Sequence, residues 1–127
     1  MGNITLEPGA RPNMSELNAI NWLHSTLGGD IGVLNAVNQH MVQTPDALWR
    51  GAYLEIKHVR GNLTTLDKQI RKGLTQTDMG TVLVDITDSS FSNGEATDIA
   101  LKRLRNKGGG CAIIIRDRDL IAYIAAK

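Results

Sequence analysis

Residues 44–58, TPDALWRGAYLEIKH, predict two short strands joined by a tight turn at residues 50–51. Successive side chains of a strand point to opposite faces, so Glu55 and Lys57 in the second strand should share one face. Asp46 lies on the adjoining strand of the same hairpin. The hairpin therefore brings two carboxylates and an ammonium group together, although charged residues on a solvated strand would show the same alternation.

The rest of the chain predicts helices and strands on either side of this hairpin. Helices are expected at 14–27, 64–75 and 95–106, and further strands at 30–37, 81–87, 111–115 and 120–126. Asn13 or Ser15 can cap the first helix, and Thr64 with Asp67 occupies positions like those of a capping box in the second. The order α-β-β-β-α-β-α-β-β predicts a mixed β-sheet flanked by helices.

Composition and charge are those of an ordinary globular domain with one uneven feature. The chain has 127 residues and a net charge of +1, but residues 1–46 carry −3 and residues 50–72 carry +4. A basic segment beside an acidic one suggests a polyanionic partner. The single cysteine, Cys111, excludes an internal disulfide and a multi-cysteine zinc site.

Neither a membrane anchor nor a small-molecule cofactor is expected from the sequence. No run of about 20 apolar residues is present. Residues 1–13 are polar and rich in helix breakers, so we expect a flexible leader, or a point at which the domain was separated from a longer protein, followed by the folded domain at 14–127. Trp22 and Trp49 are expected in the core rather than as platforms for nucleobases.

The residue types of the hairpin suit cleavage of a phosphodiester. Carboxylates such as Asp46 and Glu55 are natural ligands for Mg²⁺, which binds one or two of them together with a substrate phosphate. The metal polarises the phosphoryl oxygen and lowers the pKa of an attacking water. Lys57 would then orient that water or stabilise charge in the transition state.

Pro45-Asp46 and Glu55-Ile56-Lys57 resemble the motif of the PD-(D/E)XK nuclease superfamily, which has the restriction-endonuclease-like fold. The core of that superfamily has the order αβββαβ, and the first six elements predicted here follow it. Its first helix often supplies another acid. The resemblance implies this role for Glu16, which otherwise would be an acid on the helix surface.

A resemblance over a longer stretch, about residues 15–125, is to the C-terminal nuclease domains of polymorphic bacterial toxins, including the tRNA-cleaving tips of contact-dependent growth-inhibition proteins. The typical pattern there is TPD, a turn, and an aromatic-Glu-Ile-Lys strand. This chain departs from the pattern at Leu54, beside Tyr53, and at His58. The resemblance implies a toxin that cleaves tRNA or another nucleic acid and is neutralised by an immunity protein. It also implies delivery as part of a larger cell-surface protein into the target-cell cytoplasm.

Further residues are expected to bind substrate or to assist the reaction. Phosphate contacts are predicted for five of them, namely His58, Arg60, Lys68, Arg71 and Lys72. Gln76 would position the substrate on the resemblance and would otherwise be a loop amide. Asp85, in an apolar strand, needs a partner because a buried lone carboxylate is costly, and the site could supply one.

A metal-free mechanism remains open, because other toxin tips resemble the barnase–EndoU–colicin–RelE ribonucleases of α+β fold. In that case the reacting groups would be drawn from Lys57, His58, Arg60, Thr64 and Asp85. Glu55 or His58 would be a general base and no metal would be needed. A DNase of the same fold and a non-enzymatic nucleic-acid-binding module are the remaining alternatives.

Overall fold

Seven strands of the computed structural model, which describes residues 2–35 and 45–125, form one mixed sheet in the order of the chain. The strands are β1 (Ile4–Leu6), β2 (Ile31–Val33), β3 (Ala47–Trp49), β4 (Ala52–His58), β5 (Thr81–Asp85), β6 (Cys111–Arg116) and β7 (Asp119–Ala125). The helices are α1 (Met14–Leu27), α2 (Leu63–Gln76) and α3 (Asn93–Lys107). The predicted mixed sheet flanked by helices is confirmed, and α1-β2-β3-β4-α2-β5 follows the expected order.

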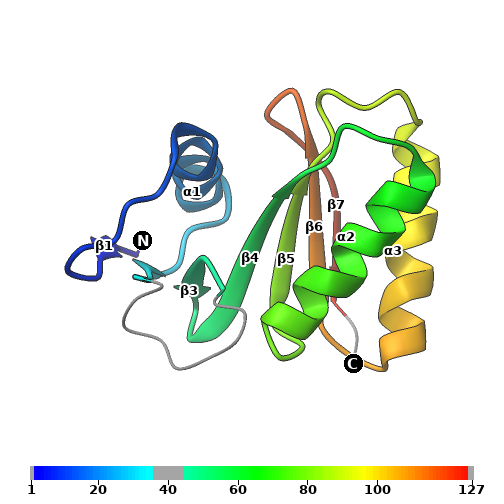
Figure 1. Cartoon of the computed structure of the whole chain (residues 1–127). Coiled ribbons are helices and arrows are strands. Elements are labelled where there is room, and N and C mark those ends of the chain that lie inside the picture. The colour runs from blue at the N-terminus through cyan, green and yellow to red at the C-terminus, as the bar shows by residue number, and fades with distance from the viewer. Residues whose placement is uncertain (1, 36–44, 126–127) are drawn as a thin grey trace.

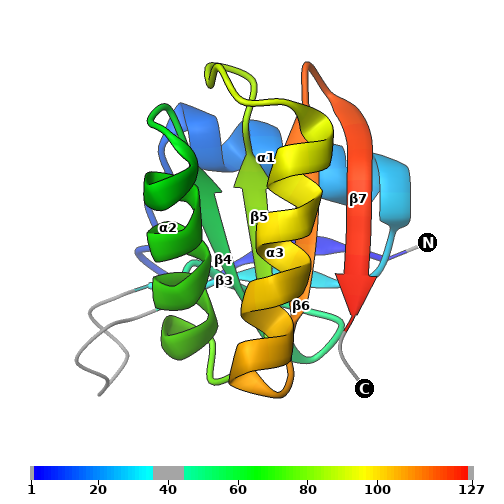
Figure 2. The ribbon, with the colours of Figure 1, turned by 90° about the vertical axis from the view of Figure 1, so that its right-hand side faces the viewer.

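The sheet is mixed: parallel pairs lie at its centre and at the β1 edge, and the other pairs are antiparallel. Strands β4, β5 and β6 run parallel, whereas β2, β3 and β4 form an antiparallel meander and β7 pairs antiparallel with β6. The two crossover helices α2 and α3 cover one face, and α1 lies on the other (Figures 1 and 2). Because β5 is covered on both faces, its residues are apolar almost throughout, as the sequence predicted.

Two hydrophobic clusters hold these layers together, one on each face of the sheet. On the α1 side, Ile20 and Leu23 pack with Leu83 of β5. On the other side, Ile70 of α2 packs in a cluster with Val82 of β5 and with residues of α3. The chain thus places three layers around β5, with α1 on one face of the sheet and α2 and α3 on the other.

Side chains at the start of α1 and α2 fix where these helices begin. Asn13 caps α1, and its capping box is completed by Glu16, whose Oε1 accepts the backbone N–H of Asn13 at 2.9 Å. Helix α2 is capped by Asn62, which accepts from the N–H of Thr65. The predicted cap at Thr64 is therefore wrong, because the helix begins one residue earlier.

The N-terminal segment is part of the sheet. Residues 4–6 of the predicted flexible leader form β1, which pairs in parallel with β2, and the backbone N–H of Glu7 extends this pairing to the carbonyl of Val33. Strand β2 is shorter than the predicted strand 30–37, whose last two residues lie outside the described residues. Within the described parts of the chain, no helix has the length and apolar character needed to cross a membrane.

Candidate active site

Asp46 was predicted within the first strand of the hairpin but lies one residue before β3, beside the part of the β4 edge that β3 leaves open. Within the hairpin, β3 pairs with residues 52–54 of β4 and leaves residues 55–58 of β4 without a strand on that side. Beyond that point, the N–H of Ile56 donates to Asp46 Oδ2 at 2.8 Å, and the N–H of Asp46 donates to Glu55 Oε1 at 3.2 Å. Asp46 thus satisfies the open edge with its side chain, and its carboxylate is brought beside that of Glu55.

Glu55 and Lys57 share one face of β4, as the alternation predicted. Lys57 Nζ lies 3.1 Å from Glu55 Oε2, and the Glu55 residue is only 6% exposed. Their neighbours Leu54 and Ile56 pack on the opposite side, in the cluster beneath α1. A buried carboxylate is tolerated where an ammonium group compensates it, so this pair is a built feature of the strand rather than a solvated charge.

Asp46 also meets Glu16, which the α1 capping box holds in place. Burial, a hydrogen bond with the Glu16 carboxyl group and the negative charge of Glu55 together raise the pKa of Asp46 from 3.8 to about 8. The hydrogen bond that Asp46 accepts from Ile56 opposes this rise and is outweighed. At neutral pH the Asp46 carboxyl group is therefore largely protonated.

A cleft of about 260 Å³ lies where α1 begins beside β4 and the end of β5. All five predicted catalytic residues line it, namely Glu16, Asp46, Glu55, Lys57 and Asp85. They come from α1, from the hairpin and from β5, which are far apart in sequence. The structure thus brings the predicted residues together in one cleft, and their catalytic roles remain a prediction.

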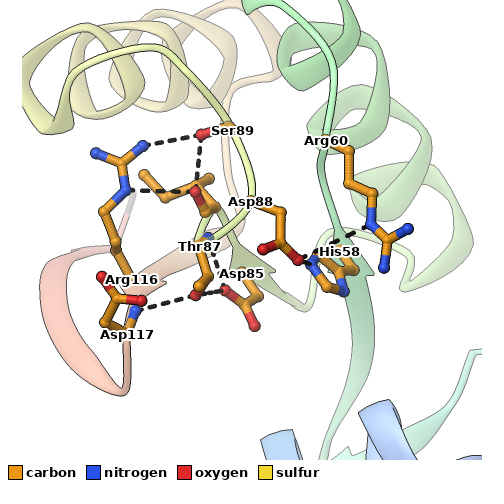
Figure 3. A network of polar contacts seen from close by, with 9 residues as sticks. His58, Arg60, Asp85, Thr87, Asp88, Ser89, Arg116 and Asp117 are labelled. Carbon is orange, nitrogen blue, oxygen red and sulfur yellow. Dashed lines mark hydrogen bonds and ion pairs between the residues drawn. The ribbon is translucent and has the colours of Figure 1, made fainter.

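Asp85 has its partner in the turn that follows β5 (Figure 3). Its Oδ1 accepts the backbone N–H of Thr87 at 2.9 Å and also the Thr87 hydroxyl group. Thr87 Oγ1 in turn accepts the N–H of Asp117 at 2.9 Å. Asp85 is only half-buried, its carboxylate is hydrogen-bonded locally, and it lines the cleft.

His58 stands at the end of β4 beside Asp88, a residue that sequence analysis did not single out. Its Nε2 lies 2.8 Å from Asp88 Oδ2, and Arg60 Nε lies 3.9 Å from the same oxygen (Figure 3). Arg116 fixes the loop that carries Asp88 by donating to Ser89 Oγ, among other groups. No spacing in the sequence signals this pair, because 30 residues separate its members.

The predicted substrate-binding residues outside β4 do not meet in the cleft. Lys68, Arg71 and Lys72 are exposed on α2, and neither they nor Arg60 lines it. Gln76 is the last residue of α2, and its Oε1 is buried with no hydrogen-bond partner among the described residues. A role for these residues in binding would involve contacts beyond the cleft itself.

The donor chemistry of the cleft fits Mg²⁺. Asp46 and Glu55 both offer carboxyl oxygens to the cleft, and burial, the hydrogen bond with Glu16 and the charge of Glu55 raise the pKa of Asp46. In the described parts of the chain, no group of three or more histidine, cysteine, aspartate or glutamate side chains is arranged to hold a metal. The protein would therefore supply two carboxylates, and substrate phosphate and water would complete the shell.

Comparison with known proteins gives one informative likeness. The sequence matches no protein-family model and no curated protein. Among solved structures, the chain is similar to a chain of the "CdiA-CT/CdiI toxin and immunity complex from Burkholderia pseudomallei", with a TM-score of 0.56, 18% sequence identity, and coverage of 95% of this chain and 98% of that one. The two chains therefore share an α/β fold over nearly their whole length.

Proposed function

We propose that this domain is a nuclease toxin that hydrolyses phosphodiester bonds of RNA, with tRNA as the expected substrate. The observation that carries the proposal is the cleft in which Asp46, Glu55 and Lys57 meet Glu16 and Asp85. Two acidic side chains in one cleft and a lysine paired with one of them are groups that metal-assisted attack on a phosphodiester can use. The likeness to a chain from a toxin and immunity complex supports the toxin setting.

In the proposed mechanism, Asp46 and Glu55 would hold a divalent cation. The bound cation would polarise the phosphoryl oxygen and acidify a water molecule. Lys57, which lies 3.1 Å from Glu55 in their ion pair, would orient the attacking water and stabilise negative charge on the phosphoryl oxygens. Glu16, positioned by its capping box, would orient the Asp46 carboxyl group through their hydrogen bond.

The biological setting is proposed on the same basis. The domain would be delivered into the cytoplasm of a target cell as part of a larger surface protein, and a cognate immunity protein would neutralise it. A chain with this fold occurs in a complex named for a toxin and its immunity protein, which supports this partner. Co-expression with the immunity protein should restore growth of cells that produce the domain.

The test is cleavage by the purified domain of tRNA, total RNA and plasmid DNA, with Mg²⁺ and with EDTA. We expect cleavage of RNA in Mg²⁺ only, and its loss in Glu55→Gln and in Lys57→Met. Matched controls are Asp98→Asn and Lys102→Met, which alter exposed residues of α3 and should retain activity. Full activity in both cleft variants, or no cleavage by the wild-type domain, would refute the proposal.

A metal-free ribonuclease is the second candidate, and the contact between His58 and Asp88 favours it. A carboxylate that holds one nitrogen of an imidazole in place orients the ring for proton transfer. His58 would then take the proton of a ribose 2′-hydroxyl group, and the product would end in a 2′,3′-cyclic phosphate. Cleavage in EDTA that leaves this end, and that His58→Gln abolishes, would replace the metal-dependent mechanism by this one.

A further inference from the structure

A groove of about 750 Å³ continues from the cleft along α1. The residues that line both are Ser15, Ala19, His58 and Asp85. One wall of the groove is the outer face of α1, and the other is formed by the ends of the central strands and by the turn between β6 and β7. The groove has the volume of a typical ligand site and opens directly onto the candidate catalytic groups.

Trp22 supplies the aromatic surface of this groove. The residue is half-buried against the cluster beneath α1, and its indole Nε1–H donates to the carbonyl of Arg118 at 2.8 Å. This hydrogen bond, between residues 96 apart in sequence, ties α1 to the turn after β6 and fixes the ring. Because its only polar atom already has a partner, the indole offers the groove an apolar surface, whereas Trp49 is buried in the core as expected.

The polar groups of the groove are mainly uncharged. The α1 wall carries amide and hydroxyl groups, which belong to Asn18, Asn21, Ser25 and Thr26. On the opposite wall Arg118 and His58 are offset by Asp85 and Asp117. A surface that follows a run of phosphates needs several cations, which this groove does not have among its described lining residues. A nucleobase needs an aromatic surface and neutral hydrogen-bonding groups, and both are present.

We propose that this groove binds one unpaired nucleotide next to the scissile phosphate, with its base against Trp22 and its polar edge towards Asn18 and Asn21. The inference rests on the proposed function and narrows its substrate to RNA that is single-stranded, or has an extruded base, at the cut. A base inside a duplex has its faces stacked and its pairing edge occupied, so it cannot enter the groove without leaving the helix. The domain would therefore cut loops and unpaired ends in preference to stems.

The test uses a synthetic RNA hairpin that spans a mapped cut in its loop, in versions with an abasic site on either side of that cut. With the wild-type domain, one abasic position should lower kcat/KM by about 5- to 100-fold, as expected for a lost base–aromatic contact. Trp22→Phe should keep most of this discrimination. Trp22→Leu should cut the intact RNA more slowly, by a similar factor, and should no longer distinguish it from the abasic RNA.

A second pair of variants keeps the test decisive if loss of the indole weakens the fold. Asn18 and Asn21 are exposed, so Asn18→Ala and Asn21→Ala should fold normally and should reduce the discrimination between intact and abasic RNA. If the abasic site lowers kcat/KM by the same factor for wild-type and variant proteins, or lowers it for none of them, the groove does not bind the base. Those results leave wild-type cleavage intact, whereas failure of the proposed function would appear as no cleavage of any RNA.

Discussion

Replacing Asp46 by asparagine should stabilise the folded domain at neutral pH and remove most of the pH dependence of its stability between pH 4 and pH 8. Asparagine keeps an oxygen for the N–H of Ile56 and offers an amide donor to Glu16. It removes the carboxyl group whose burial and acidic neighbours raise its pKa to about 8. The substitution thus preserves the contacts of the position and deletes only its ionisation.

The direction and the size of the change in the free energy of unfolding follow from the pKa values of Asp46 in the unfolded and folded states. The unfolded chain releases this proton near pH 3.8, and the folded domain keeps it to about pH 8. Between these values the unfolded state binds fewer protons, so the free energy of unfolding falls as pH rises, by about 1.4 kcal/mol per pH unit. From pH 4 to pH 7 the free energy of unfolding would fall by about 4 kcal/mol if Asp46 were fully shielded from solvent. Its partial solvent exposure reduces the expected fall to about 2–3 kcal/mol.

Urea denaturation followed by circular dichroism, in EDTA and at a series of pH values from 4 to 9, measures this effect. The wild-type midpoint should decline up to about pH 8 and then level off, and Asp46→Asn should stay nearly constant over that interval. Asp98→Asn, an exposed control on α3, should follow the wild type. Parallel curves for wild type and Asp46→Asn would show that the carboxyl group is ionised in the folded domain and would refute the reasoning.

Addition of Mg²⁺ extends the same measurement without requiring catalysis. If Asp46 and Glu55 bind the cation, it should displace the proton of Asp46 and raise the wild-type midpoint most at pH 7–8. Asp46→Asn should respond weakly because it has lost one ligand. An equal response of both proteins to Mg²⁺ would place any bound cation away from Asp46.

Three further changes test how the scaffold holds the site. Arg103→Gln removes two hydrogen bonds of 2.9 and 2.7 Å to Asp67 that join α3 to α2, and should cost about 0.5–1 kcal/mol in urea denaturation at pH 7. Arg103 lowers the pKa of Asp67, so this contribution is present above pH 3.8 and lost as pH falls through the lowered value. Gly73→Ala would place Cβ 2.7 Å from a methyl carbon of Val82 and should lower net stability by about 1–2 kcal/mol. Leu83→Ala, fully buried in β5, should lower it by about 2–5 kcal/mol, and an unchanged midpoint for either core variant would contradict the packing described.

Much of the fold was predictable because it depends on local patterns. The bounds of α1 follow from apolar spacing between a capping asparagine and the glycine that ends the helix. The turn between β3 and β4 has positive φ angles at Arg50 and Gly51, which the tight turn predicted from the sequence accommodates. Strand β1 was missed because a segment of three residues is too short to carry a periodic signal and becomes a strand only by pairing with β2.

The sequence by itself determined which residues could act together on one strand. The period of two in β4 puts Glu55 and Lys57 on a common face whatever surrounds them, and their ion pair follows from that spacing. The sequence also predicted that Asp46 would lie near this face, because a tight hairpin returns the chain to the same place. These features are local, so they did not depend on knowing how the helices pack.

Only the tertiary structure decided the chemical state and the surroundings of these groups. Packing of α1 on the sheet brings Glu16 against Asp46 and raises the pKa of Asp46 to about 8, since burial and a second carboxyl group act across 30 residues of chain. The loop after β5 sets Asp88 beside His58, and the turn after β6 sets Arg118 beside Trp22. Such contacts join segments that are far apart in the sequence, and therefore no local motif predicts them.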